Sequence, residues 1–177
     1  MAVSPLSQIT PSADDPTRAS RIAALRAQAN EHIRQERLVF SEEELRDIEA
    51  RYRSAHQQDY PMLLKPDAAP ILRELVTRYP KAHRSGCAVL DLARLVSGEA
   101  RERYLQEAIA NHNDAWCESG VQVGALARAR LAIHYADQQR LEDAERLAKK
   151  LVTLFPDAID DSGALLNGVL RGVQLLR

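Results

Sequence analysis

The apolar residues of the chain recur with a helical period over most of its length. Between residues 20 and 38 the apolar positions lie three or four residues apart, as on one face of an amphipathic helix, at Ile22, Leu25, Ala29 and Ile33. Residues 1–19 hold three prolines among Ser, Thr and Asp and lack this period. We therefore expect a flexible N-terminal tail over 1–19 and a first helix from Ser20.

A second helix is expected to begin after Ser41. The Ser41 side chain can cap this helix while Glu44 reaches back to the Ser41 backbone, the reciprocal arrangement called a capping box. Pro61 and Pro66 interrupt the helical pattern further on. Since proline removes a backbone donor and disfavours helix before it, residues 58–66 should form a loop.

Six more helices follow from the same periodicity. Gly98 separates two of them, because glycine readily takes the left-handed conformation past a helix end. Residues 113–120 form a loop between two others. The expected helices cover about residues 67–79, 85–96, 99–112, 121–138, 141–155 and 162–176.

Two segments of the chain repeat each other. Residues 75–82 read LVTRYPKA and residues 151–158 read LVTLFPDA, and each ends an amphipathic helix with an aromatic residue and a proline. The offset, 151 − 75 = 76 residues, corresponds to two units of 38. A period of this size is typical of stacked helix pairs, in which each pair covers the apolar face of the next.

Residues 125–158 resemble a tetratricopeptide repeat (TPR), a helix-turn-helix unit of about 34 residues with small and large residues at fixed positions. The other units depart from the pattern, because Glu49 and Arg101 replace small residues and Asn113 replaces the closing proline. The matching positions are Leu131, Ala132, Tyr135, Ala144, Ala148, Leu151 and Pro156.

The resemblance implies an all-α fold, a helix-turn-helix repeat array that forms a short TPR-like right-handed solenoid. N-terminal helices would precede the array and a C-terminal helix would cap it. The expected organisation is a single domain over residues 20–177, with repeat-like units at about 42–82, 83–120 and 121–158 and a capping helix at 162–176.

The same resemblance implies a binding surface, because the first helix of each pair lines an inner groove in this family. Leu126 and Ala88 stand where a clamp for a peptide carboxyl terminus would need polar side chains, which argues against a clamp for chaperone tails. The alternative for the arginines is a solvated face with local ion pairs. The implied groove residues are Arg84, Asp91, Arg94, Leu126, Arg130, Ile133 and Asp137.

Two further features are candidate contact sites. Trp116, the single tryptophan, lies in the loop 113–120, either as the lip of a binding site or, as we favour, packed into a gap of the stack. The C-terminal helix carries a broad apolar face that includes Leu166 and Leu170. This helix should cap the stack, and its apolar breadth also indicates a homodimer or partner contact.

Composition agrees with a helical globular protein and restricts its partners. Of 177 residues, 45% are hydrophobic and 28% charged, while seven glycines and 5% aromatic residues disfavour a β-sandwich or barrel. The net charge of −1 gives no general attraction to nucleic acid, and no apolar run approaches the ~20 residues of a membrane span. Without a secretory signal pattern, and with an excess of Arg over Lys that often reflects a GC-rich bacterial genome, we expect a bacterial cytoplasmic protein.

Chemical motifs are missing from the sequence. It contains no G-x-x-x-x-G-K-[ST], G-x-G-x-x-G, H-E-x-x-H or G-x-S-x-G pattern, so we expect neither an enzyme nor a bound cofactor or metal. His83, Cys87, His112 and Cys117 match no zinc spacing. With two cysteines we expect no disulfide framework, and Cys87 should be a small buried apolar side chain.

The hypothesis from the sequence is a non-catalytic interaction or scaffold module that binds a peptide or protein in the groove or along the C-terminal helix. Two alternatives stay open. One is a small helical-repeat chaperone for secretion or assembly. The other, which we favour less, is a metal-binding protein or enzyme that uses the loop 113–120.

Overall fold

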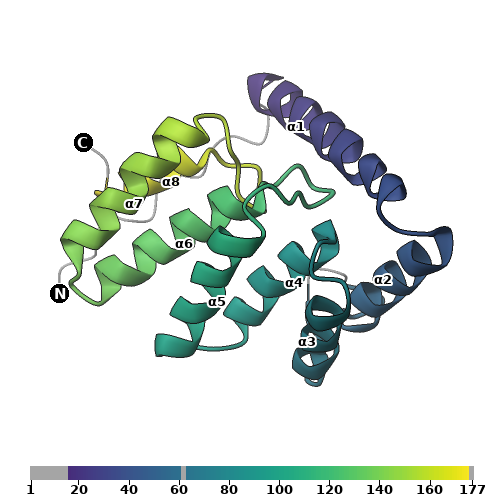
Figure 1. The fold of residues 1–177 in the computed structure, drawn as a ribbon. Coiled ribbons are helices and arrows are strands. Elements are labelled where there is room, and N and C mark those ends of the chain that lie inside the picture. Colours follow the sequence, from purple (N-terminus) through teal and green to yellow (C-terminus); the bar gives the residue numbers. More distant parts are fainter. Residues whose placement is uncertain (1–15, 61–62, 176–177) are drawn as a thin grey trace.

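The computed structural model describes residues 16–60 and 63–175, and over these ranges the chain forms helices joined by turns, without a strand. This confirms the expected all-α class (Figure 1). None of the described helices is both long and apolar enough to cross a membrane. The elements are α1 (Pro16–Arg34), the 3₁₀ helix η1 (Gln35–Leu38), α2 (Glu42–Ser54), α3 (Ala68–Arg78), α4 (His83–Arg94), α5 (Gly98–Asn111), α6 (Val123–Asp137), α7 (Leu141–Leu154) and α8 (Leu166–Gly172).

Local sequence signals explain several helix ends. The capping box before α2 is confirmed, because Ser41 Oγ accepts the Glu44 N–H at 3.3 Å and Glu44 Oε2 accepts the Ser41 N–H at 2.8 Å. Gly98 has the expected left-handed backbone, with φ at +57°.

The predicted start of the first helix is wrong, since α1 begins at Pro16 instead of Ser20. Proline suits a first helical position, because its missing N–H would have no helical partner there. Of the predicted tail, residues 1–15 lie outside the described residues.

The helices pack in sequence order. Each helix from α2 to α7 contacts the next, and α2, α4, α6 and α8 also contact one another in succession. Five buried residues of α6 are glycine or alanine, and their small side chains let neighbouring helices pack close to its backbone. These residues are Gly124, Ala125, Ala127, Ala129 and Ala132.

The ends of α3, α5 and α7 are structurally equivalent, but their spacing is unequal. The residues after these helices are Tyr79, His112 and Phe155, and each donates its N–H to the carbonyl four residues back. The intervals are 33 and 43 residues, so these helix ends are not spaced evenly, as two units of 38 would be. The difference arises because a longer turn follows α5.

One seven-residue turn occurs twice. Residues 114–120 read DAWCESG before α6, and residues 157–163 read DAIDDSG before α8. Both turns contain an isolated β-bridge, Trp116 with Gln122 and Ile159 with Leu165, and both end on a glycine with positive φ. We call these segments the two acidic turns. The second one replaces the start of the predicted helix 162–176, which is why α8 begins only at Leu166.

The glycines of the acidic turns let α1 pack closely against these turns. A Cβ on Gly120 would lie 3.0 Å from the backbone nitrogen of Arg26, and a Cβ on Gly163 would lie 2.5 Å from Ile22 Cδ1. The predicted apolar stripe of this helix faces the turns, because Leu25 is buried and packs in the same cluster as Trp116. α1 therefore lies along the edge of the molecule that the turns form (Figure 1).

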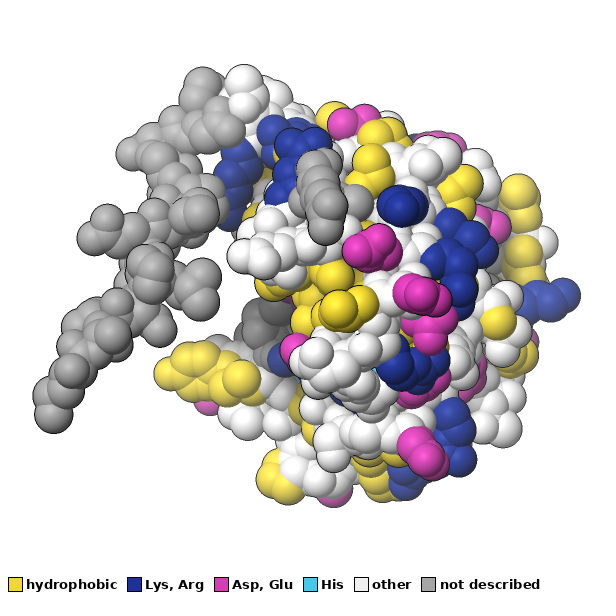
Figure 2. All heavy atoms as spheres, turned by 90° about the vertical axis from the view of Figure 1, so that its left-hand side faces the viewer, with side chains coloured by type: hydrophobic (Ala, Val, Ile, Leu, Met, Phe, Trp, Pro, Cys, Tyr) yellow, Lys and Arg dark blue, Asp and Glu magenta, His cyan; other side chains and the backbone are white. Residues whose placement is uncertain are grey.

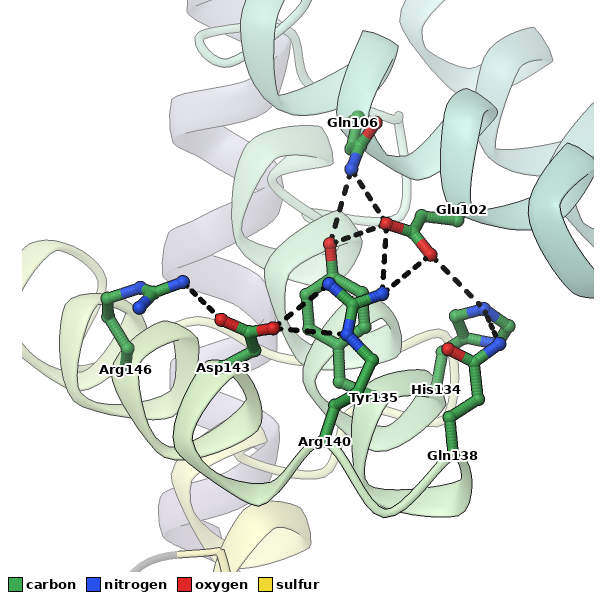
Figure 3. A network of polar contacts seen from close by, with 8 residues as sticks. All are labelled: Glu102, Gln106, His134, Tyr135, Gln138, Arg140, Asp143 and Arg146. Carbon is green, nitrogen blue, oxygen red and sulfur yellow. Dashed lines mark hydrogen bonds and ion pairs between the residues drawn. The ribbon is translucent and has the colours of Figure 1, made fainter.

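A polar network joins α5, α6 and α7 (Figure 3). The Glu102 carboxylate accepts hydrogen bonds from Tyr135 Oη at 2.9 Å, Gln106 Nε2 at 3.0 Å and Arg140 at 3.0 Å. The Arg140 guanidinium lies 3.8 Å from the centroid of the Tyr135 ring and also pairs with Asp143. The network satisfies Glu102 within the helix junction and so fixes the turn between α6 and α7.

The C-terminal helix does not present the apolar face that the sequence predicts. Leu166 and Leu170 are 1% and 0% exposed, because they pack into the core beside α6 and α7. Val173, just past α8, stays 46% exposed. Figure 2 views this end of the molecule, and its visible hydrophobic side chains form separate groups among charged ones. The assignment of Leu166 and Leu170 to a partner surface is therefore wrong.

Replacing Gly120 with alanine tests how α1 is held. Gly120→Ala should lower the free energy of unfolding by about 1–3 kcal/mol, because alanine is strained at positive φ and its Cβ would meet the α1 backbone. Urea unfolding followed by circular dichroism measures the change, and hydrogen exchange should show that α1 loses protection first.

Gly172→Ala is the matched control, since a Cβ at Gly172 has no atom within 4 Å. This change should leave stability within about 0.5 kcal/mol of the original. Equal stabilities of the two variants would contradict the proposed support of α1.

Candidate functional site

A cleft of about 880 Å³ opens along α2, α4 and α6. α1 contributes Arg26 to its wall, and the two acidic turns contribute Glu118 and Asp161. The charged lining residues are Arg26, Arg53, Lys65, Arg84, Arg94 and Arg130 against Glu49, Asp91, Glu118 and Asp161. Six cations face four carboxylates, so the formal charge of the lining is 6 − 4 = +2, in a chain whose net charge is −1.

The cleft brings together half of the residues expected to bind a partner. Those that line it are Arg84, Asp91, Arg94, Leu126 and Arg130. Those that do not line it are Trp116, Ile133, Asp137, Leu166 and Leu170. Trp116 is 5% exposed, in agreement with the packing interpretation that we favoured, and Ile133 packs against the core. Asp137 is the last residue of α6, beyond the stretch of this helix that lines the cleft.

Arg84 is held in the lining by several contacts. It donates to both carboxylate oxygens of Glu49, at 2.7 and 3.1 Å, pairs with Glu118 at 2.7 Å, and lies 4.6 Å from the centroid of the Tyr52 ring. Burial works against the charge of Arg84, but Glu49 and Glu118 raise its pKa. Glu49, which departs from the small residue of a TPR, is thus the carboxylate that fixes this arginine.

Tyr52, His56 and Asp91 form a buried cluster beside Arg84. His56 Nδ1 lies 2.8 Å from the Tyr52 carbonyl, its Nε2 lies 3.3 Å from Asp91 Oδ2, and Tyr52 Oη donates to the same carboxylate at 3.0 Å. The bond to Asp91 raises the pKa of His56, and burial raises the pKa of Tyr52. Both imidazole nitrogens lie against oxygen atoms of the protein, so the contacts with Tyr52 and Asp91 hold the ring in place.

Arg130 lines the cleft from α6 and has a different environment. It is 19% exposed, and its NH2 group donates to Asp161 Oδ2 at 2.6 Å. Burial lowers the pKa of Arg130 and Asp161 raises it, while Arg94 adds a like charge nearby. Arg94 itself donates to Asp91 at 3.1 Å.

Cys87 and Cys117 form a disulfide in the wall of the cleft, with their Cα atoms 6.1 Å apart. The expectation of a free buried Cys87 is therefore wrong. Cys87 is the fifth residue of α4 and Cys117 belongs to the first acidic turn, which packs on the start of α4. Their separation of 30 positions gave no sequence signal for a pair, because only folding brings the turn onto α4.

His83 and His112 do not join the cysteines in a metal site. His83 Nδ1 accepts the Trp116 N–H at 2.9 Å, and the Trp116 ring stacks on His32 of α1 at 5.6 Å. Across the described residues, no three His, Cys, Asp or Glu side chains converge as a metal ion would require. Cys87, Cys117 and His83 instead fasten the first acidic turn to α4.

Sequence reasoning missed the contributions of α2 and of the acidic turns to the cleft. Glu118 and Asp161 hold the same position in the two turns, so the repeat DAxx(E/D)SG could have identified them. His56 and Asp91 are 35 residues apart and belong to no motif, so no pattern in the sequence joins them. No protein-family model matches the chain, and neither a curated protein nor a solved structure matches it.

Removing the disulfide should destabilise the protein. The variant with Cys87→Ala and Cys117→Ala should lose about 3–4 kcal/mol of unfolding free energy, the loop-closure value for a 30-residue separation. Urea unfolding measures this loss, and a thiol reductant should produce a similar one in the original protein. The reductant should leave the double variant unaffected; a reductant-insensitive original protein would refute the disulfide.

The pH dependence of stability should distinguish His56 from His112. Since Asp91 raises the pKa of folded His56 above its usual 6.5, the stabilisation by His56 is present below about pH 6.5 and is lost as the pH rises through the folded pKa. The His56→Gln variant should have a lower free energy of unfolding than the original protein, and this difference should shrink as the pH increases. Urea unfolding over a pH series measures it.

The contribution of His112 to stability should change with pH in the opposite direction. Burial lowers its pKa, so its contribution is lost as the pH falls from about 6.5 toward the folded pKa, and His112→Gln should reduce the acid sensitivity of the protein. Identical pH profiles for the two variants would contradict both assignments.

Proposed function

We propose that the chain is a non-catalytic interaction module that holds a peptide segment of a partner protein in the cleft. The observation that carries this proposal is the cleft itself, about 880 Å³ in volume, with Leu90 and Leu126 among charged side chains. Binding sites combine an apolar wall with a few placed polar groups in this way. The ion pairs of Arg84 and the contact of His56 with Asp91 support a site that recognises charge.

A TPR-like solenoid is part of this proposal. The order in which the helices pack, each on the next and α2, α4 and α6 on each other, is that of stacked helix pairs. The cleft runs along the first helix of each pair, which is the surface that the resemblance implies for a partner.

We propose an oxidising compartment in place of the cytoplasm expected from the sequence. The disulfide between Cys87 and Cys117 supports this, because such bonds persist in secreted and periplasmic proteins and are rare in the cytosol.

A small chaperone for secretion or assembly is the second candidate function. Leu38 and Val39, which are 88% and 63% exposed at the turn between α1 and α2, favour it. Exposed apolar residues suit a surface that shields unfolded chains. A chaperone would bind apolar peptides through this turn, whereas the proposed module would bind its peptide in the cleft.

A steric block separates these functions. Peptides selected from a random library on the original protein should lose binding at least tenfold when Ala50→Trp fills the cleft from α2, since Ala50 is an exposed lining residue. Fluorescence anisotropy of labelled peptides measures the affinity. Ala110→Trp, an exposed site on α5 outside the cleft lining, is the control and should bind normally.

Peptides that bind Ala50→Trp as tightly as the original protein would overturn the assignment of the cleft. If such peptides lost binding to a variant with Leu38→Ser and Val39→Ser, the chaperone surface would replace it.

A further inference from the structure

Each acidic turn places a carboxylate on an arginine of the preceding cleft helix. Glu118, before α6, pairs with Arg84 of α4 at 2.7 Å; Asp161, before α8, pairs with Arg130 of α6 at 2.6 Å. The two acids occupy the same position of the repeated turn. The chain thus supplies two internal carboxylates to its own cleft.

The two arginines differ in how firmly they are held. Arg84 keeps the bidentate contact with Glu49 and the Tyr52 ring even without Glu118. Arg130 is 19% exposed and its side-chain partner, Asp161, is 42% exposed on a turn. If a ligand carboxylate replaced Asp161 on Arg130, Asp161 would turn toward water and Arg130 would keep an ion-pair partner.

We infer that the cleft binds an acidic peptide segment, one carboxylate of which takes the place of Asp161 on Arg130. This inference rests on the proposed function and names the chemistry of its ligand. The arrangement suits such an exchange, because a largely buried guanidinium lines the cleft and its carboxylate partner is 42% exposed on a turn.

Charge complementarity favours this occupant. The lining carries a formal charge of +2 while the chain carries −1, so the positive field is concentrated in the cleft. Each lining carboxylate already pairs with a lining cation, namely Glu49 and Glu118 with Arg84, Asp91 with Arg94, and Asp161 with Arg130. A basic peptide would have to separate these pairs before it met a carboxylate.

A nucleic acid is a poorer fit for this site. Backbone phosphates are bound by basic stripes with many cations, and affinity rises with the number of phosphates that they neutralise. In the cleft, four carboxylates lie among the cations and would face the phosphates of a nucleic acid. A carboxylate side chain can instead bind a single arginine in the fork geometry that favours it.

Three short labelled peptides of equal length test the inference, with alternating Glu and Ala, Gln and Ala, or Lys and Ala. Fluorescence anisotropy should show the Glu peptide binding at least tenfold more tightly than the Gln peptide, with no binding of the Lys peptide. High salt should weaken the Glu complex, since partly exposed ion pairs are screened.

Two substitutions locate the contact. Asp161→Asn should tighten binding of the Glu peptide severalfold, because the internal competitor is gone, and Arg130→Gln should weaken it roughly tenfold. Asp157→Asn, in the same turn, and Arg103→Gln, on α5, change the charge equally at exposed positions outside the lining and should have little effect. Circular dichroism verifies that each variant folds.

The other outcomes are equally informative. If the Gln peptide binds as tightly as the Glu peptide and Ala50→Trp blocks both, the cleft binds peptides but the inference is wrong. If Asp161→Asn weakens binding, Asp161 is not a competitor and the inference is also wrong. An RNA oligonucleotide that binds more tightly than the Glu peptide would overturn it, and failure of the Glu peptide and of every library peptide would remove the proposed function as well.

Discussion

The close contact between α1 and the glycines of two equivalent turns is the constraint on which the arrangement depends. Gly120 and Gly163 adopt positive φ and leave no room for a Cβ, so α1 can lie against the turns. The turns in turn set the starts of α6 and α8 and carry Glu118 and Asp161 into the cleft. One local sequence pattern therefore determines both the position of α1 and the charges that a partner would meet.

The electrostatics of the cleft follow from burial as much as from composition. Arg84 pairs with both carboxylate oxygens of Glu49 and with Glu118, and His56 lies between the Tyr52 carbonyl and Asp91. Arg130 pairs with the partly exposed carboxylate of Asp161. The disulfide in the wall ties the first acidic turn to α4. The two arginines of the cleft therefore differ in how many carboxylates hold them.

Sequence patterns predicted what depends on neighbouring residues. The capping box at Ser41, the helical stripe of α1 and the left-handed Gly98 are local, and the structure has all three. Half of the expected partner residues line the cleft, because one helix of each pair faces it. Contacts between distant segments were not predictable: the Cys87–Cys117 bond and the His56–Asp91 pair depend on how turns and helices meet. Leu166 and Leu170 were misassigned because an apolar helix face looks the same whether its own core or a partner covers it.

The most direct test of the account is a structure of the protein with an acidic peptide bound. We expect a peptide carboxylate within hydrogen-bonding distance of the Arg130 guanidinium, Asp161 turned toward solvent, and Arg84 still paired with Glu49. A peptide bound away from α2, α4 and α6, or one in the cleft with the Arg130–Asp161 pair intact, would contradict it.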